Sequence, residues 1–162
     1  YITSTYKPYG LHRARKYSDF SQPKLIGPSM FVQPCYCYDD QNLFVGMSYN
    51  IITPKDDTNL LFILGIINSK YAQDWFHSNA KHRGAGVDVG VDKLRTFPIA
   101  SATKFQQQQI IDLVNIILVK KRQDPQSNTS IEENAIDAIV YDLYSLTDTE
   151  IKIIEQSIYT QQ

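Results

Sequence analysis

Two short segments of the chain combine positive charge with groups that can bind a nucleic acid. The first holds four cations, three tyrosines and one histidine: Tyr6, Lys7, Tyr9, His12, Arg13, Arg15, Lys16 and Tyr17. Arginine can hold a phosphate or the O6/N7 edge of guanine through two hydrogen bonds. Tyrosine can hydrogen-bond a phosphate or stack against an exposed base. We predict that this segment contacts DNA; the alternative is a solvated loop whose tyrosines fill the core.

The second segment places cations next to glycines: Lys81, His82, Arg83 and Gly84, followed by Ala85 and Gly86. Glycine allows the N–H groups of the backbone to approach a phosphate closely. We predict a second DNA contact here; the alternative is a flexible surface loop. Binding through phosphates needs several such contacts, so neither segment is sufficient alone.

Reactive constellations are lacking in the sequence. The glycines at 84 and 86 are not followed by the third glycine of a dinucleotide fingerprint, and they follow a helix pattern instead of a strand. Phosphate-loop, nucleophile-elbow and zinc-helix motifs are missing as well. The adjacent carboxylates at 39–40 and 56–57 are typical of turns and helix caps. We therefore expect no catalytic residue, cofactor site or metal site in the chain itself.

The cysteine usage bears on the compartment. Cys35 and Cys37 are separated by one residue, and a disulfide between them would be strained. The three histidines do not complete a zinc site with them. We expect reduced, partly buried thiols and a cytoplasmic protein. No apolar run reaches the length of about 18 residues that a membrane span needs, so we expect no membrane partner.

The front third of the chain is typical of short strands and turns. Tyr, Phe and Val alternate there with Pro and Gly. The predicted strands are 24–26, 31–32, 36–38, 43–47 and 49–53, with a turn at 39–42. A long helix is predicted over about 59–79, with Asp57 or Thr58 as its N-cap. A loop over 81–92 and a short strand around 93–99 follow.

The remainder is predicted to be helical. Each of three segments begins with a capping-box pattern, a hydroxyl followed three residues later by Glu or Gln. These patterns are Thr103/Gln106, Ser130/Glu133 and Thr147/Glu150. The fold class is thus α+β: a small mixed or antiparallel β lobe with a long helix, then a three-helix C-terminal bundle. We assign residues 1–100 to a β-rich recognition lobe and 101–162 to a helical support, within one domain or two lobes that share a core.

The charge distribution agrees with this division without deciding it. Residues 1–104 hold 12 Lys and Arg against 8 Asp and Glu, whereas residues 105–162 hold 4 against 9. A mildly basic lobe on an acidic support fits a nucleic-acid surface mounted on a scaffold. The chain begins with Tyr instead of Met, so we expect it to be a piece of a longer protein.

Several ordered motifs over about residues 20–157 resemble the TaqI-like C-terminal specificity domain of restriction-modification enzymes and adenine-specific DNA methyltransferases. They are Pro23–Ile26, Tyr38–Asp40, Leu64–Lys70, Leu94–Ile99 and Ile136–Glu150. Ser145 departs from the pattern, because a glycine is expected there. Within these motifs we interpret Asn68 and Ser69 as a helix bend or a backbone hydrogen bond, and Tyr141 and Tyr144 as anchors of helix packing.

The resemblance implies a target-recognition domain of a type II, single-chain (IIG-like) enzyme, which positions an N6-adenine methyltransferase or endonuclease on its site. The implied partners are double-stranded DNA and the methyltransferase domain of the same parent chain. The implied cofactors of the parent are S-adenosylmethionine, and Mg²⁺ if it cleaves DNA. The resemblance transfers no catalytic residue to this chain. The alternative is a protein-interaction or scaffold domain that does not bind DNA.

Overall fold

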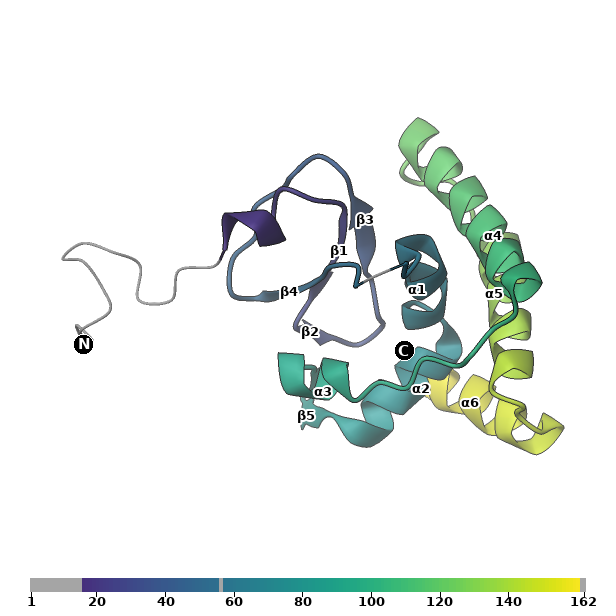
Figure 1. The fold of residues 1–162 in the computed structure, drawn as a ribbon. Coiled ribbons are helices and arrows are strands. Elements are labelled where there is room, and N and C mark those ends of the chain that lie inside the picture. Colours follow the sequence, from purple (N-terminus) through teal and green to yellow (C-terminus); the bar gives the residue numbers. More distant parts are fainter. Residues whose placement is uncertain (1–15, 56, 161–162) are drawn as a thin grey trace.

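A computed structural model describes residues 16–55 and 57–160 (Figure 1). Strands gather on one side of the molecule, helices α4 to α6 form the other side, and α1 and α2 lie between them. The elements in chain order are η1 (Tyr17–Asp19, a 3-10 helix), β1 (Lys24–Pro28), β2 (Met30–Phe31), β3 (Cys37–Asp39), β4 (Tyr49–Ile52), α1 (Leu60–Ile67), α2 (Lys70–Asn79), β5 (Lys81–Arg83), β6 (Gly86–Asp88), α3 (Val91–Arg95), α4 (Lys104–Gln123), α5 (Ser130–Leu143) and α6 (Asp148–Thr160). The α+β class is confirmed.

The strands form two small antiparallel sheets. One has the order β3-β1-β4, and its central strand pairs Leu25 with Tyr38 on one side and with Ile52 on the other. The other has the order β2-β6-β5. Ser29 joins them, because it lies between β1 and β2 and its carbonyl accepts the N–H of Val89 at 2.7 Å. The strand predicted at 43–47 is wrong: this segment is an irregular loop.

The single helix predicted over 59–79 is two helices in the structure, α1 and α2, which are broken at Asn68 and Ser69. The Asn68 side chain accepts the N–H of Tyr36 at 2.8 Å and donates to its carbonyl at 2.9 Å. Ser69 is the N-cap of α2, and its hydroxyl accepts the N–H of Ala72. These hydrogen bonds confirm the interpretation of both residues and tie the break to Tyr36, the residue directly before β3.

The N-cap of α1 is Asn59, not Asp57 or Thr58 as expected. Its Oδ1 accepts the N–H groups of Leu61 at 2.9 Å and Phe62 at 3.4 Å. The helix behind this cap reads LLFILGII and is buried on most of its circumference. It packs on α4, α5, β1 and β3 and is therefore the centre of the fold.

The segment after β6 also differs from expectation. A strand was predicted at 93–99, but residues 91–95 form the short helix α3 and the residues after it are irregular. The spacing of apolar residues could not distinguish a strand from a helix here, because Phe97 is the one residue of 93–99 that is buried in the core. Lys93 of α3 lies over the Trp75 ring, 5.9 Å from its centroid, a cation–π contact that favours the helical path.

Two of the three predicted capping boxes are confirmed. At the start of α4 the hydroxyl of Thr103 accepts the Gln106 N–H, and the Gln106 side chain accepts the Thr103 N–H. Thr147 and Glu150 make the same reciprocal pair before α6. The box expected at Ser130/Glu133 is wrong, because α5 begins one residue earlier than that pattern implies and its N-cap is Thr129.

One hydrophobic core spans the strands and the helices. It requires a close approach of α1 to α4 at Gly65, where a Cβ atom would lie 2.4 Å from a methyl carbon of Ile110. A smaller cluster of Tyr141, Ile154 and Ile158 fixes α6. The buried members of the main cluster are Leu25, Phe31, Tyr36, Leu60, Phe62, Leu64, Ile66, Ile67, Ala72, Phe76, Val87, Val89, Phe97, Ile110, Val114, Ile136 and Val140.

The tyrosines near the end of α5 anchor helix packing, as the sequence indicated. The Tyr144 hydroxyl donates to the Pro98 carbonyl at 2.5 Å, and its ring stacks on Tyr71 with centroids 3.9 Å apart. The Tyr141 hydroxyl donates to Glu155 of α6 at 2.9 Å. Ser145, at the position where a glycine was expected, has φ +52°, a left-handed conformation that favours glycine.

Candidate nucleic-acid interface

The predicted loop at 81–92 is instead a β-hairpin that projects its cations into solvent. Lys81, His82 and Arg83 form β5, the edge strand of the second sheet, and all three are exposed. Gly84 makes the turn with φ +61°, a conformation that residues with a side chain rarely adopt. A short, charged edge strand resists pairing with other chains, and the three side chains of β5 remain exposed.

The arginine of the hairpin retains its hydrogen-bonding capacity. Its nearest carboxylate is that of Asp88, with 3.7 Å between Nε and Oδ2, and this separation exceeds a hydrogen bond. Lys81 makes no ion pair with any residue in the described part of the chain. Both cations can therefore bind a phosphate or a base edge.

Two histidines, His77 and His82, lie side by side where α2 meets the hairpin. The rings of His77 in α2 and His82 lie 6.0 Å apart in an edge-on arrangement. His77 is buried, and its Nε2 lies 2.7 Å from the carbonyl oxygen of Val32. Because a carbonyl only accepts, Nε2 must carry the proton. His77 is thus held to the segment after β2, and His82 lies beside it at the surface.

Most of the first predicted cluster lies outside the described residues. This holds for Tyr6, Lys7, Tyr9, His12, Arg13 and Arg15. Lys16 and Tyr17 are described, and both are exposed at the start of η1. The Tyr17 ring is 5.9 Å from that of Phe44, whereas the hairpin pairs with β2 and contacts His77. The two predicted clusters therefore have different neighbours.

The sequence reasoning missed an exposed apolar group in the loop between β3 and β4. Leu43, Phe44 and Met47 are 57%, 63% and 91% exposed. All three lie in the segment 43–47 that was predicted to be a strand. The available signals against a strand were the turn-forming Asn42, which has φ +60°, and Gly46.

A buried ion pair anchors this loop. Lys24 and Asp39 are paired with side chains 0% and 2% exposed. Lys24 also donates to the Phe20 carbonyl at 2.9 Å. Asp39 accepts the N–H groups of Gln41 and Leu43, each at 3.1 Å. Burial raises the pKa of Asp39, but the hydrogen bonds from Lys24 and the two N–H groups outweigh it and leave this pKa below its usual value.

A second charged cluster joins α2, α5 and α6. The Lys70 ammonium lies 3.0 Å from Glu155 and 3.6 Å from Asp137. Burial raises the pKa of Asp137 to about 6, although Lys70 partly counteracts it. Burial lowers the pKa of Lys70, but both carboxylates more than compensate, so it is raised. All three groups hold helices together, and the Lys70 backbone N–H also donates to Asp137 at 2.9 Å.

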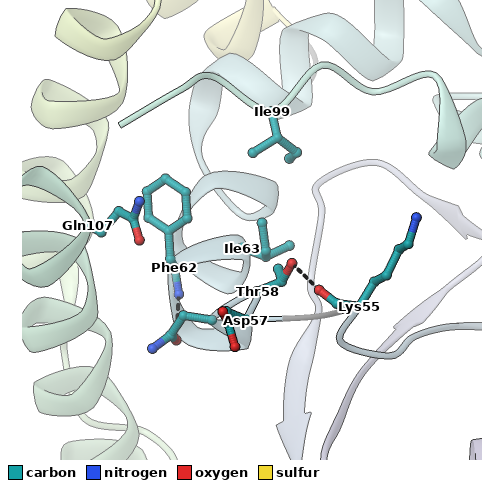
Figure 2. Close-up of a pocket in the computed structure, with 8 residues that line it drawn as sticks. Lys55, Asp57, Thr58, Phe62, Ile63, Ile99 and Gln107 are labelled. Atoms are coloured by element: carbon teal, nitrogen blue, oxygen red, sulfur yellow. Dashed lines mark hydrogen bonds between the residues drawn. The ribbon is translucent and has the colours of Figure 1, made fainter. Parts of the chain in front are cut away.

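Two hollows lie in the described part of the surface. One, of about 400 Å³, lies where Phe62 and Ile63 of α1 face Ile99 and Gln107 (Figure 2). Thr58 at its rim donates to the Lys55 carbonyl at 2.6 Å, so this hydroxyl is engaged in the turn before α1. The arrangement offers no pair of nucleophile and base.

The other hollow, of about 460 Å³, lies between the segment before β3 and helices α1, α4 and α5. Cys35 and Cys37 line it; both are free, and both residues are exposed although their sulfur atoms are partly covered, as expected of partly buried thiols. Burial of the sulfur atoms raises the pKa of both thiols, so neither is an activated nucleophile at neutral pH. Within residues 16–55 and 57–160 no group of three His, Cys, Asp or Glu side chains could hold a metal.

Comparison with known proteins identifies the family. Residues 1–99, more than half of the chain, match the family described as the TaqI-like C-terminal specificity domain. The chain belongs to this family. The resemblance seen in the sequence is therefore confirmed, although the match ends before the Ile136–Glu150 motif. The exposed hairpin, η1 and the β3–β4 loop all lie inside the matched part.

A protein that is similar in sequence to this chain is named as a methyltransferase, which is consistent with the family. Over 121 residues the chain is 27% identical to the Type II methyltransferase M.BanIII of Aneurinibacillus aneurinilyticus, a match that covers 71% of this chain and 20% of that protein. The chain thus spans about a fifth of the length of that relative. In the part of the chain that the structure describes, no helix is long and apolar enough to cross a membrane.

Proposed function

We propose that this chain is the DNA target-recognition domain of a type II, single-chain (IIG-like) restriction-modification enzyme. It positions an N6-adenine methyltransferase, or an endonuclease, on a short DNA site. The observation that carries the proposal is the family match over 1–99, together with a relative named as a type II methyltransferase. The partners are double-stranded DNA and a methyltransferase domain of the same parent chain.

The DNA contacts that we propose lie on the β-rich lobe. They are Lys81, His82, Arg83 and Gly84 of the hairpin, Lys16 and Tyr17 of η1, and Tyr6, Lys7, Tyr9, His12, Arg13 and Arg15 before it. Three consecutive exposed residues on an edge strand, two of them cations, support the first group. In this proposal residues 1–100 recognise DNA, while residues 101–162 support the lobe and set its distance from the catalytic domain.

The cofactors of the parent enzyme are S-adenosylmethionine, and Mg²⁺ where it cleaves. The glycines at 84 and 86 do not fit the nucleotide-like cofactor, because this turn joins two antiparallel strands instead of a strand and a helix. We place its site in the catalytic domain. The free thiols of Cys35 and Cys37 favour a reducing compartment, and we propose the cytoplasm.

The test is a selection of bound sequences from a library of random DNA duplexes, followed by fluorescence anisotropy with the enriched duplex. We expect one short motif to be enriched, and weak binding whose affinity falls steeply between about 50 and 200 mM salt, as phosphate contacts require. Folded protein that enriches no motif and binds no duplex would favour a scaffold domain instead.

A matched pair of variants locates the contacts. Lys81→Ala removes an exposed cation of the hairpin, and Lys152→Ala removes an exposed cation of α6 on the support. We expect Lys81→Ala to weaken binding and reduce the salt slope by about 1, as the loss of one phosphate contact predicts, and Lys152→Ala to leave both unchanged. Equal effects of the two variants would remove the hairpin from the interface.

A further inference from the structure

The β3–β4 loop, residues 40–48, displays apolar side chains to solvent from fixed supports. At its start, Asp39 accepts the N–H groups of Gln41 and Leu43. At its end, the carbonyl of Ser48 accepts the N–H of Ser29 at 2.8 Å and its hydroxyl at 3.1 Å. Both ends of the loop are thus held by hydrogen bonds, and the side chains of Leu43, Phe44 and Met47 between them are exposed.

The ring of Phe44 is covered on one face by the ring of Phe20. Its ring stacks on the buried ring of Phe20, with centroids 4.6 Å apart and planes inclined by 16°. Tyr17 of η1 stands beside it at 5.9 Å with a tilt of 42°. Even so, Phe44 remains 63% exposed. Figure 1 shows the loop passing beside η1, on the side of the strands away from α4 and α5.

We propose that the β3–β4 loop contacts the stacked bases of the bound DNA through Phe44 and Met47, at a base step that it opens. This inference rests on the proposed function and adds a second kind of contact to the cationic ones. Phe, Leu and Met are the residue types that insert between base steps. A ring held flat on one face can stack a base on the other, whatever that base is.

The position of the loop favours DNA over a protein as the occupant. The loop lies inside the family match, and its aromatic neighbour Tyr17 directly follows Lys16. Arg13 and Arg15 precede Lys16 by three positions and one in the sequence. Among the described residues, the cation Lys16 therefore lies next to the aromatic neighbour of Phe44, a combination used by proteins that bind unstacked bases.

The experiment uses the duplex obtained by selection and compares Phe44→Ala with Phe105→Ala, an equally apolar ring that is 72% exposed on α4. We expect Phe44→Ala to weaken binding by roughly 5- to 150-fold, the range for loss of one stacked base. The dependence on salt should stay unchanged, since stacking releases no counterions. Phe105→Ala should bind like the unmodified chain.

Because Phe44 also covers Phe20, further variants guard against misfolding. Phe44→Trp retains a stacking surface and should restore affinity, and Met47→Ala, at a side chain that is 91% exposed, should weaken binding in a folded protein. Duplexes that carry 2-aminopurine at the site should brighten with the unmodified chain and not with Phe44→Ala.

Two failures are distinguishable. Normal affinity of both Phe44→Ala and Met47→Ala, with Lys81→Ala still impaired, would overturn the base-contact proposal alone and assign the loop to a protein partner. Absence of any salt-dependent DNA binding by the folded, unmodified chain would overturn this proposal and the proposed function together.

Discussion

Replacing Lys24 with Met should destabilise the fold strongly. The change removes an ammonium that is 0% exposed and leaves the carboxylate of Asp39, 2% exposed, without its counter-charge. Loss of one partner of a buried pair costs about 3–5 kcal/mol. The two N–H groups that Asp39 accepts, from Gln41 and Leu43, offset part of this cost. We therefore expect a loss of about 3 kcal/mol in the free energy of unfolding at pH 7.

The assay is unfolding in urea followed by fluorescence of Trp75, the only tryptophan of the chain, whose ring packs edge-on against Phe76 and Phe97. The double variant Lys24→Met/Asp39→Asn leaves no charge buried and should recover part of the loss. The control is Asp92→Asn, which breaks a pair with Arg95 on the open surface and should not change stability measurably.

The pH dependence gives an independent check. The pKa of Asp39 is lower in the folded state, so its stabilising contribution is present above the unfolded value of about 4 and is lost as pH falls through the folded value. Without Lys24 the buried carboxyl favours its protonated form. The difference between the unmodified chain and Lys24→Met should therefore begin to shrink above about pH 4, where the variant's carboxyl takes up a proton, and should continue to shrink as pH falls through the lowered pKa of Asp39 in the unmodified chain. A loss under about 1 kcal/mol at pH 7, or a difference independent of pH, would refute this reasoning.

Three further predictions concern stability. Ser145→Gly should raise the free energy of unfolding by about 1 kcal/mol, because φ is +52° there; a lower urea midpoint would contradict it. Gly65→Ala should lower stability by about 1–3 kcal/mol, because its Cβ would lie 2.4 Å from Ile110, while Gly46→Ala, with no atom within 4 Å, serves as the unaffected control. NMR of the carboxyl groups should give Asp137 a pKa near 6. The free energy of unfolding should therefore fall as pH rises from about 4 to 6, because the buried carboxyl loses its proton in that range. Asp137→Asn should flatten this dependence of stability on pH, and a pKa of about 4 for Asp137 would refute the burial argument.

The parts of the fold that were predicted correctly depend on local signals. The starts of α4 and α6 are encoded by hydroxyl and carboxyl or amide side chains three residues apart, Thr103/Gln106 and Thr147/Glu150. The break between α1 and α2 could be suspected from Asn68 and Ser69. That the helix ends completely at this break could not be predicted, because the break depends on hydrogen bonds to the backbone of Tyr36, 32 residues earlier.

The charged residues of the candidate site could be predicted from the sequence, but the backbone structure that displays them could not. The cations at 81–83 were identified from residue type, but the hairpin that displays them depends on pairing of β6 with β2, more than 50 residues earlier in the chain. The exposure of Phe44 and Met47 depends on the Lys24–Asp39 pair and on Ser29. Contacts between distant segments leave no periodicity in the sequence.

The common core of strands and helices has a consequence for engineering. Gly65 of α1 lies against Ile110 and Val114 of α4 and Ile136 of α5, which a cut at residue 99 would remove. A chimera that exchanges only residues 1–99 between relatives would place a foreign α1 on the native Ile110 and Val114 surface. Transplanting a new DNA preference should therefore succeed either with α4 and α5 included, or with exchanges confined to the hairpin and the β3–β4 loop, which lie outside that contact.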